Sequence, residues 1–443
     1  MQAETSSSND ASAVKEMAHA AALYIKPGGS FVLLGIAFVL TLAMLARNGI
    51  FGVVETFSDE HDHFKRSMMF ASIVRGNANL EAIGTFYAGG IWPPLYPMLM
   101  GSIQALTNCG VGFLRGTNVL LAYGGFAFLI GAIAQPWGRY IGIVVVALFV
   151  IGTHYYFQIR PESLVLLLLG AAIFLIVKYR LFSVGTQGQP SRYVLCGALF
   201  AMACLTHAFV AVLAIYLVIL ALLRVRYRFH FVVAFALIAG PYVAAQAMIH
   251  NGVVLFATTA EENLARNNNV FLRNHERPQA DELLFAEMER RYQAGDKVTY
   301  PRPMLLPQGR YEQWLHDENK RRIFKEMAME EVRADPAGAA IRAMQRVTGL
   351  IGGEGCVPGQ RYGCNVSPKL DLMAFYGLEL MALIGLIYAA RSERIRVSSF
   401  SFAIACVALL APMIVTQAVE RQFVIVLVLA SFGGLARLKS PRT

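Results

Sequence analysis

Charged residues are scarce in this sequence. They make up 15% of its 443 residues, whereas a soluble domain carries roughly 25%. Hydrophobic residues make up 56%. A chain this apolar must bury its surface in lipid or aggregate, and apolar runs long enough to cross a bilayer, about 17–25 residues, recur from end to end. The composition excludes a soluble globular domain and predicts an integral membrane protein.

Familiar catalytic signatures are also absent. The sequence contains no Walker-type phosphate-binding loop, no Gly-x-Ser-x-Gly elbow and no His-Glu-x-x-His motif. It has no clear internal repeat, which disfavours the transporter folds built from duplicated halves. The net charge is +10, but the basic residues lie in short loops between apolar runs. That placement is typical of a membrane face, so no nucleic-acid partner is expected.

Cysteines are few and scattered. Of the six, Cys196, Cys204 and Cys406 lie inside apolar runs, where we expect them to be packing residues. Cys356 and Cys364 lie eight residues apart in a Gly- and Pro-rich polar stretch. This spacing predicts a local disulfide if the stretch faces an oxidising compartment.

The apolar runs predict about ten spanning helices. They cover 31–47, 116–134, 140–156, 163–178, 193–206, 208–223, 231–249, 370–390, 397–417 and 422–436. Lys and Arg concentrate in alternate short loops, which assigns those loops and both termini to the cytoplasm. No small-residue cleavage pattern follows the first run, so it is read as a retained anchor.

This topology divides the chain into four parts. They are a cytoplasmic tail over 1–30, a transmembrane module over 31–249 with a first external loop over 48–115, an external loop over 250–369, and the last spans with a short cytoplasmic tail over 370–443. The expected fold is all-α and polytopic, with juxtamembrane helices in the first external loop and further helices in the large second one.

Two segments outside the spans are expected to be surface helices. Ile91–Asn108 is apolar enough to span, but counting it as a span would reverse every basic loop after it. It opens with Trp92-Pro93-Pro94, and proline is tolerated only at a helix start, so we place it along the outer interface. In the second loop, 319–334 has helical spacing. Asp335-Pro336 then starts an amphipathic helix over 336–350 that is predicted to lie on the membrane surface.

The densest polar cluster is Asp59-Glu60-His61-Asp62-His63, just outside the first span. Carboxylates and imidazoles this close together can bind a divalent ion or supply a general base. A solvated polar loop has the same composition. The position at the outer membrane edge, where a lipid headgroup would come, favours a functional site.

The short loops on the predicted outer side hold two arginines, against the positive-inside trend: Arg160 and Arg421. A guanidinium fork suits a phosphate group, which favours an anionic partner. Ion pairs with the neighbouring Glu162 and Glu420 are the structural alternative. His207, between the fifth and sixth spans, lies on the same side, although a lone His is more often structural.

The order of these features resembles the GT-C glycosyltransferases, in particular the branch that contains the protein O-mannosyltransferases and the lipid A aminoarabinose transferase. Ser58-Asp59-Glu60 resembles the acidic pair that follows their first span. Pro93-Pro94-Leu95-Tyr96-Pro97 resembles their Pro-Pro-Leu-Tyr segment, and Arg160-Pro161-Glu162 a motif that ends in an acidic residue before the fourth span. Thr206-His207 stands where the family often has Thr-Lys, and Arg421 where a late basic residue is common.

The resemblance implies a sugar transferase of the bacterial inner membrane that faces the periplasm or the cell exterior. Its donor would be a polyprenyl-phosphate sugar among the membrane lipids, and its acceptor a protein, a lipid or a glycan. Asp59 would act as the base and the transfer would invert the anomeric carbon. Glu60, His61 or His63 would hold a divalent ion (Mg²⁺ or Mn²⁺) or orient Asp59. The residues around the substrates would be Trp92, Pro94, Tyr96, Arg160, Glu162, His207 and Arg421.

Two other functions fit the same topology. A transporter or flippase for lipid-linked sugars would share the spans and an external anionic site, but transporters place ionisable residues near the bilayer midplane, where this sequence has almost none. A non-catalytic scaffold would leave the pairing of Asp59-Glu60 with Pro93-Pro94 unexplained.

Overall fold

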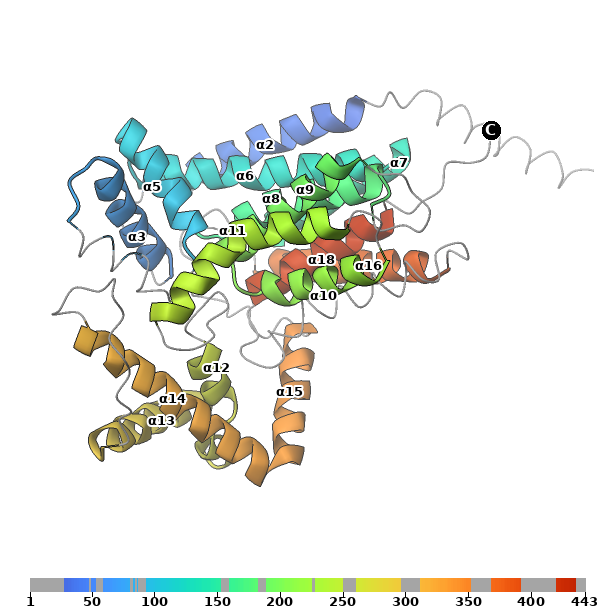
Figure 1. Cartoon of the computed structure of the whole chain (residues 1–443). Coiled ribbons are helices and arrows are strands. Elements are labelled where there is room, and N and C mark those ends of the chain that lie inside the picture. Colours follow the sequence, from blue (N-terminus) through green and yellow to red (C-terminus); the bar gives the residue numbers. More distant parts are fainter. Residues whose placement is uncertain are drawn as a thin grey trace, which may run out of the picture.

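The computed structural model is helical throughout the residues that it describes. These are 28–47, 49–52, 59–79, 83, 86, 93–152, 159–181, 189–224, 228–249, 260–295, 311–351, 368–391 and 420–435. Within them lie fifteen α-helices and one 3₁₀ helix, and no strand (Figure 1). The predicted all-α fold is confirmed for this part of the chain.

Nine of the ten predicted apolar runs form helices, most of them side by side in one bundle (Figure 1). They are α2 (Gly29–Arg47), α6 (Val111–Ala132), α7 (Pro136–Gly152), α8 (Glu162–Lys178), α9 (Pro190–Thr206), α10 (Val210–Arg224), α11 (Arg228–Ile249), α16 (Pro368–Arg391) and α18 (Glu420–Leu435). The run 397–417 lies outside the described residues. Three helices, α2, α6 and α11, are long and apolar enough to cross a membrane. The count of ten spans stays a prediction.

Small residues bring the backbones of α6 and α8 close together. A Cβ atom added at Gly125 of α6 would lie 2.7 Å from the carbonyl oxygen of Leu166, and one added at Gly170 of α8 would lie 2.7 Å from the carbonyl oxygen of Gly125. Such close approach through small residues is how helices associate in lipid. It sets α8 firmly beside α6, which matters for the site described below.

The bundle has an apolar interior that includes packed aromatic rings, and an apolar exterior. Phe126 of α6 packs edge-on against Phe149 of α7, with ring centroids 5.1 Å apart. On the outside, Val32, Leu40 and Leu237 are more than half exposed. Large apolar side chains exposed over a whole surface are expected where that surface contacts lipid rather than water.

Two shorter helices, α3 (Asp59–Val74) and α5 (Leu95–Thr107), pack together at one end of the bundle (Figure 1). The proline pair acts as predicted, because Pro94 is the N-cap residue of α5. With 13 residues, α5 is about 20 Å long and cannot cross a hydrocarbon core of about 30 Å. The charged residues at 59–63 form the first turn of α3, where carboxylates interact favourably with the helix dipole.

A second group of helices forms the helical subdomain, residues 260–351. It contains α12 (Ala260–Asn267), the 3₁₀ helix η2 (Val270–Arg273), α13 (Arg277–Gln293), α14 (Tyr311–Ala334) and α15 (Pro336–Ile351). It has its own hydrophobic core, which includes Leu284, Ile323 and Phe324. The predicted helix start at Asp335-Pro336 is confirmed, since Asp335 Oδ1 accepts a hydrogen bond from the Gly338 amide at 2.8 Å. Helix α14 ends where predicted but begins at Tyr311 rather than at 319.

Candidate functional site

Four helix starts meet at the end of the bundle that carries α3 and α5. They belong to α3, α5, α6 and α8, together with the short segment 159–161 that leads into α8. We call the polar residues gathered there the polar cluster. It consists of Glu60, His63, Tyr96, Arg115, Asn118, Arg160 and Glu162.

An ion pair between Glu60 and Arg115 lies at the centre of the polar cluster. The guanidinium of Arg115 donates from Nε to Oε1 and from NH2 to Oε2 of Glu60, both at 2.8 Å. Glu60 is fully buried and Arg115 is 3% exposed. Oε1 of Glu60 also accepts the Ile159 amide at 2.9 Å, and Arg115 donates to the Ile50 carbonyl at 2.6 Å. One pair thus joins the chain after α2, the first turn of α3, α6 and the entry to α8.

This geometry bears on the role of Glu60. A buried ion pair is retained only where its geometry and hydrogen bonds offset the cost of desolvation, and here both carboxylate oxygens are taken up. Glu60 therefore fixes the first turn of α3 in place. The two roles predicted for Glu60, binding an ion and orienting Asp59, stay predictions.

Tyr96 is fully buried beside this pair. Its hydroxyl donates to Oδ1 of Asn118 at 3.1 Å and accepts from Nδ2 of Asn118 at 2.9 Å. Asn118 Nδ2 also lies 3.4 Å from the Arg160 carbonyl oxygen. The His63 ring packs edge-on against the Tyr96 ring, with centroids 5.5 Å apart. The Tyr96 side chain on α5 therefore contacts both α3, through His63, and α6, through Asn118.

The surroundings of Tyr96 keep its hydroxyl protonated. Burial raises the pKa of Tyr96 well above its ordinary value, and the carboxylates of Glu162 and Glu60 raise the pKa further. The hydrogen bond from Asn118 opposes this shift. At neutral pH the phenol is thus a hydrogen-bond donor, held close to two carboxylates and to Arg160.

The third predicted motif, Arg160-Pro161-Glu162, completes the polar cluster. Glu162 is the first residue of α8 and is 2% exposed, while Arg160 is half-buried two residues earlier. Pro94 is buried at the start of α5. The structure thus brings together the three segments singled out in the sequence, namely 59–63, 93–97 and 160–162.

His207 makes local contacts at the end of α9. It ends α9 as the C-cap residue, its Nδ1 accepts the Phe209 amide at 3.4 Å, and its ring lies 4.8 Å from the Phe209 ring. This fits the structural role that a lone histidine usually has. His61, in contrast, is exposed on α3.

Several predicted residues cannot be placed. Trp92, Cys356 and Cys364 lie outside the described residues, as do the side chains of Asp59 and Arg421. Asp59 begins α3 and Arg421 lies in the first turn of α18. In the part of the chain that the structure describes, no three His, Cys, Asp or Glu side chains are grouped to hold a metal ion. The predicted metal site and the disulfide stay predictions.

Two members of the cluster, Arg115 and Asn118, were not singled out in the sequence. The predicted second span begins at 116 and leaves Arg115 in a loop, whereas α6 begins at Val111. A hydrophobicity criterion ends a span at a charge, but this charge is neutralised by Glu60 and the helix continues past it. The sequence did contain a signal for Arg115, because this residue is a further arginine at the outer end of a predicted span.

A further arginine, Arg66 of α3, is half-buried one turn after His63 of the polar cluster. It donates to the Phe86 carbonyl at 3.1 Å, and its guanidinium lies 5.3 Å from the centre of the Phe86 ring. Burial lowers the pKa of Arg66 to about 10, against the attraction of Tyr242 and Asp62. Arg66 remains cationic at neutral pH.

Comparisons of the chain with protein-family models, curated proteins and solved structures give no match.

Proposed function

We propose that the chain is a membrane glycosyltransferase that transfers a sugar from a polyprenyl-phosphate donor to an acceptor hydroxyl on the external side. The observation that carries this proposal is the convergence of the starts of α3, α5 and α8 at one end of an apolar bundle. These starts hold three of the five features by which the sequence resembles the GT-C enzymes. In a bacterium the reaction would take place at the inner membrane, facing the periplasm or the cell exterior.

The proposed reaction is a single displacement. Asp59 takes the proton of the acceptor hydroxyl while that oxygen attacks the anomeric carbon. The bond from this carbon to the phosphate oxygen breaks, and the lipid phosphate leaves with the electron pair. One displacement inverts the anomeric configuration. Arg160, Arg66 and Arg421 are the cations that would stabilise the negative charge on the leaving phosphate.

The other residues position these groups. Glu60 and Arg115 hold the first turn of α3, which carries Asp59. Tyr96 and Glu162 are buried beside them, and they would form hydrogen bonds with the donor only if their present contacts opened. A divalent ion held by Glu60 and His63 is the alternative arrangement, and it would require the ion pair with Arg115 to open.

Transfer by the purified protein in lipid tests the proposal. A radiolabelled polyprenyl-phosphate sugar is supplied with protein, lipid and glycan acceptors, and transfer by the Asp59→Asn variant is measured. Loss of the base should lower the rate by about 10²–10⁴-fold. Asp62→Asn is the matched control, because Asp62 is an exposed carboxylate on the same helix. If the transfer rate is unchanged in Asp59→Asn, Asp59 is not the base.

One observation favours a transporter of lipid-linked sugars instead. Glu379 is a carboxylate within the predicted span α16, and its Oε1 has no hydrogen-bond partner among the described residues. Ionisable residues inside spans often mark a transport pathway. Donor that crosses a vesicle membrane without being transferred, and stops crossing in Glu379→Gln, would establish this second function in place of the first.

A further inference from the structure

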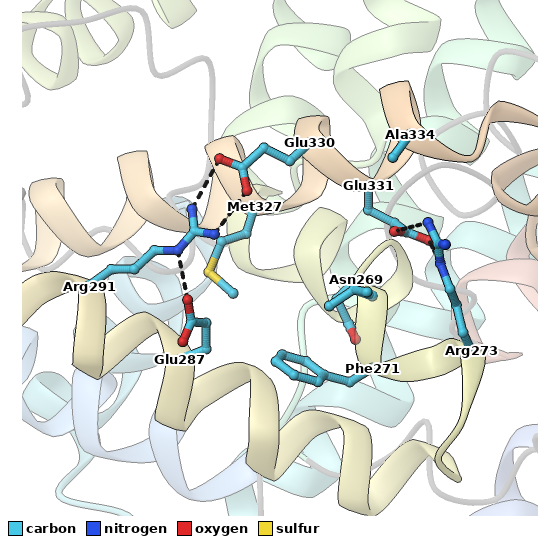
Figure 2. A pocket seen from close by; sticks show the side chains of 10 residues that line it. Asn269, Phe271, Arg273, Glu287, Arg291, Met327, Glu330, Glu331 and Ala334 are labelled. Carbon is cyan, nitrogen blue, oxygen red and sulfur yellow. Dashed lines mark hydrogen bonds and ion pairs between the residues drawn. The ribbon is translucent and has the colours of Figure 1, made fainter.

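The helical subdomain contains a pocket of about 400 Å³ between α13, α14 and η2 (Figure 2). This volume lies within the range of small-ligand sites, about 300–1,000 Å³. Its lining residues are Asn269, Val270, Phe271, Arg273, Glu287, Arg291, Met327, Glu330, Glu331 and Ala334. Charged side chains form two walls of the pocket, with Phe271, Asn269 and Met327 between them (Figure 2).

The first wall is an ion-pair group across α13 and α14. Arg291 donates from NH1 and NH2 to the two oxygens of Glu330, at 3.1 and 2.9 Å, and from Nε to Oε1 of Glu287 at 3.0 Å. Arg290 also binds Glu287 with two hydrogen bonds, at 2.6 and 2.7 Å. These contacts fix the directions of the charged groups before any ligand arrives.

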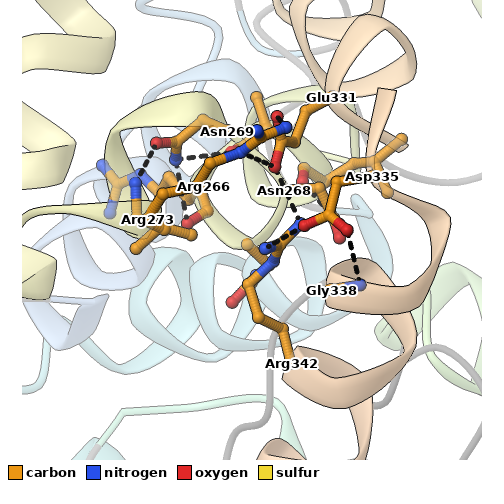
Figure 3. Close-up of polar contacts among 12 residues, drawn as sticks. Arg266, Asn268, Asn269, Arg273, Glu331, Asp335, Gly338 and Arg342 are labelled. Atoms are coloured by element: carbon orange, nitrogen blue, oxygen red, sulfur yellow. Dashed lines mark hydrogen bonds and ion pairs between the residues drawn. The ribbon is translucent and has the colours of Figure 1, made fainter. Parts of the chain in front are cut away.

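The second wall is built on Glu331, which is 4% exposed. Arg273 of η2 donates to both of its oxygens, at 3.0 and 2.7 Å. Arg342 of α15 donates to its Oε1 at 3.1 Å and lies 3.5 Å from Asp335 (Figure 3). The wall is therefore held from three elements.

The charges of the two walls balance. Two arginines and three carboxylates line the pocket itself, Arg273 and Arg291 against Glu287, Glu330 and Glu331. When their ion-pair partners behind the lining, Arg290, Arg342 and Asp335, are counted with them, four arginines meet four carboxylates. An anion such as phosphate would be repelled by the carboxylate paired with each arginine, and a cation would be repelled by the arginine paired with each carboxylate. A neutral ligand meets neither cost.

The polarity and the shape of the pocket restrict the class of ligand further. Carboxylates have lone pairs, and guanidinium groups have N–H donors, beyond those used in the ion pairs. A hydroxyl group both donates and accepts, so it can bind a carboxylate and an arginine of the same wall. Phe271 and Met327 provide an apolar surface between the walls. A molecule with hydroxyls around its edge and C–H groups on its face matches this arrangement.

We propose that this pocket binds a neutral saccharide of one or two rings, with its C–H face on Phe271 and its hydroxyls on the two walls. A further step rests on the proposed function: this saccharide belongs to the acceptor, which makes a glycan the acceptor class. The helical subdomain then holds the acceptor while the polar cluster holds the donor.

Binding to the full-length protein in lipid nanodiscs tests the site. The probes are three neutral disaccharides (maltose, cellobiose and lactose), measured by saturation-transfer NMR and calorimetry. We expect saturable binding of at least one, weakened at least fivefold by Glu330→Gln and by Arg291→Lys, which keeps the charge but loses the fork. Glu326→Gln is the matched control, because Glu326 lies on α14 and pairs with Arg322. Unchanged unfolding temperatures show that the variants remain folded.

Other results would overturn the proposal. Absence of binding by all three disaccharides, or binding that Glu330→Gln and Arg291→Lys leave unchanged, removes the saccharide site. Saturable binding of inorganic phosphate or of a tetralysine peptide, competing with the sugar, contradicts the balance of charges.

A separate measurement distinguishes this site from the proposed function. Asp59→Asn should abolish transfer and leave disaccharide binding intact. With a glycan acceptor, Glu330→Gln should raise the acceptor KM at least fivefold with little change in kcat. Transfer that persists in Asp59→Asn overturns the proposed reaction but not the pocket, whereas an unchanged KM in Glu330→Gln overturns the acceptor step alone.

Discussion

Glu60 and Arg115 are two opposite charges removed from water at the end of an apolar bundle. Each is held by backbone groups as well as by the other, since Ile159 donates to Glu60 and Arg115 donates to Ile50. Removing one partner of a buried pair leaves the other charge without compensation. The two side chains therefore depend on each other in a way that exposed pairs on the helical subdomain do not.

A double-mutant cycle at this pair follows from that dependence. Glu60→Gln should lower the free energy of unfolding by about 3–5 kcal/mol, because Arg115 stays buried without a counter-charge. Arg115→Met should cost about as much, and the double variant should be more stable than the sum of the two losses predicts. Denaturant unfolding of the protein in detergent measures these differences.

The exposed pair of Arg322 and Glu326 on α14 provides the control. Glu326→Gln should cost less than about 1 kcal/mol. Equal losses at both pairs would show that Glu60 and Arg115 are hydrated in solution.

Glu287 gives a prediction about pH. Hydrogen bonds from Arg290 and Arg291 lower the pKa of Glu287 to about 2, below its value of about 4.3 in an unfolded chain. A group with a lowered folded pKa contributes its full stabilisation above the unfolded pKa, and loses it as the pH falls towards the folded pKa. The contribution of Glu287 should therefore be constant above about pH 5 and vanish near pH 2.

Hydrogen exchange of peptides from α13 measures this contribution. The wild-type protein should be better protected than Glu287→Gln at pH 6, and the difference, corrected for intrinsic exchange rates, should shrink steadily below pH 4.5. A difference that is constant down to pH 2.5 would contradict the lowered pKa.

At the scale of elements, the polar cluster depends on where helices begin. Proline determines the start of α5, and the start of α8 follows Pro161, so both could be placed closely from the sequence. The start of α6 could not, since Arg115 belongs to the helix only because Glu60 lies opposite. The extent of α3 was equally hidden, because its mixed polar and apolar residues also fit an irregular loop.

Helix α15 shows two different faces. Arg342 and Arg346 point to the helical subdomain, where they donate to Glu331 and to the Asn267 carbonyl oxygen. Ile341 and Met344 are 58% and 62% exposed. An apolar face turned away from the core of its own subdomain fits the predicted position on a membrane surface.

Spin labels test the position of α15. In a background in which all six native cysteines are replaced, a nitroxide at Met344→Cys should be relaxed more by oxygen, which concentrates in lipid, than by a water-soluble nickel chelate. The control is a nitroxide at Gln293→Cys, an exposed position at the end of α13, where the chelate should dominate. Equal accessibility to the chelate at both sites would place α15 in water.

At the scale of the whole molecule, two groups of helices have separate hydrophobic cores. The bundle forms one core, and the helical subdomain forms the other. The subdomain falls between α11 and α16 in the sequence, so both of its ends lead to apolar helices of the bundle. This arrangement suits a protein in which a membrane part holds the lipid donor and an external part holds the acceptor.

Membrane topology is the prediction at this scale. In a background in which all six native cysteines are replaced, an impermeant thiol reagent should label Asp62→Cys from outside intact cells and Glu393→Cys only after the cells are opened. Asp62 is exposed on α3, so its labelling reports sidedness rather than burial. The opposite labelling pattern would invert the chain and move the polar cluster to the cytoplasmic side.

The sequence by itself determined the apolar helices and their order. Apolar runs and prolines act locally, so nine of the ten predicted apolar runs could be located as helices, together with the start of α5 and the capped start of α15, without any tertiary contact. What it could not determine is which polar groups meet. Only the packing of α3, α5, α6 and α8 brings Glu60 to Arg115, which lies 55 residues away along the chain. Burial makes that pair important for stability, because a charge removed from water needs a counter-charge within the fold.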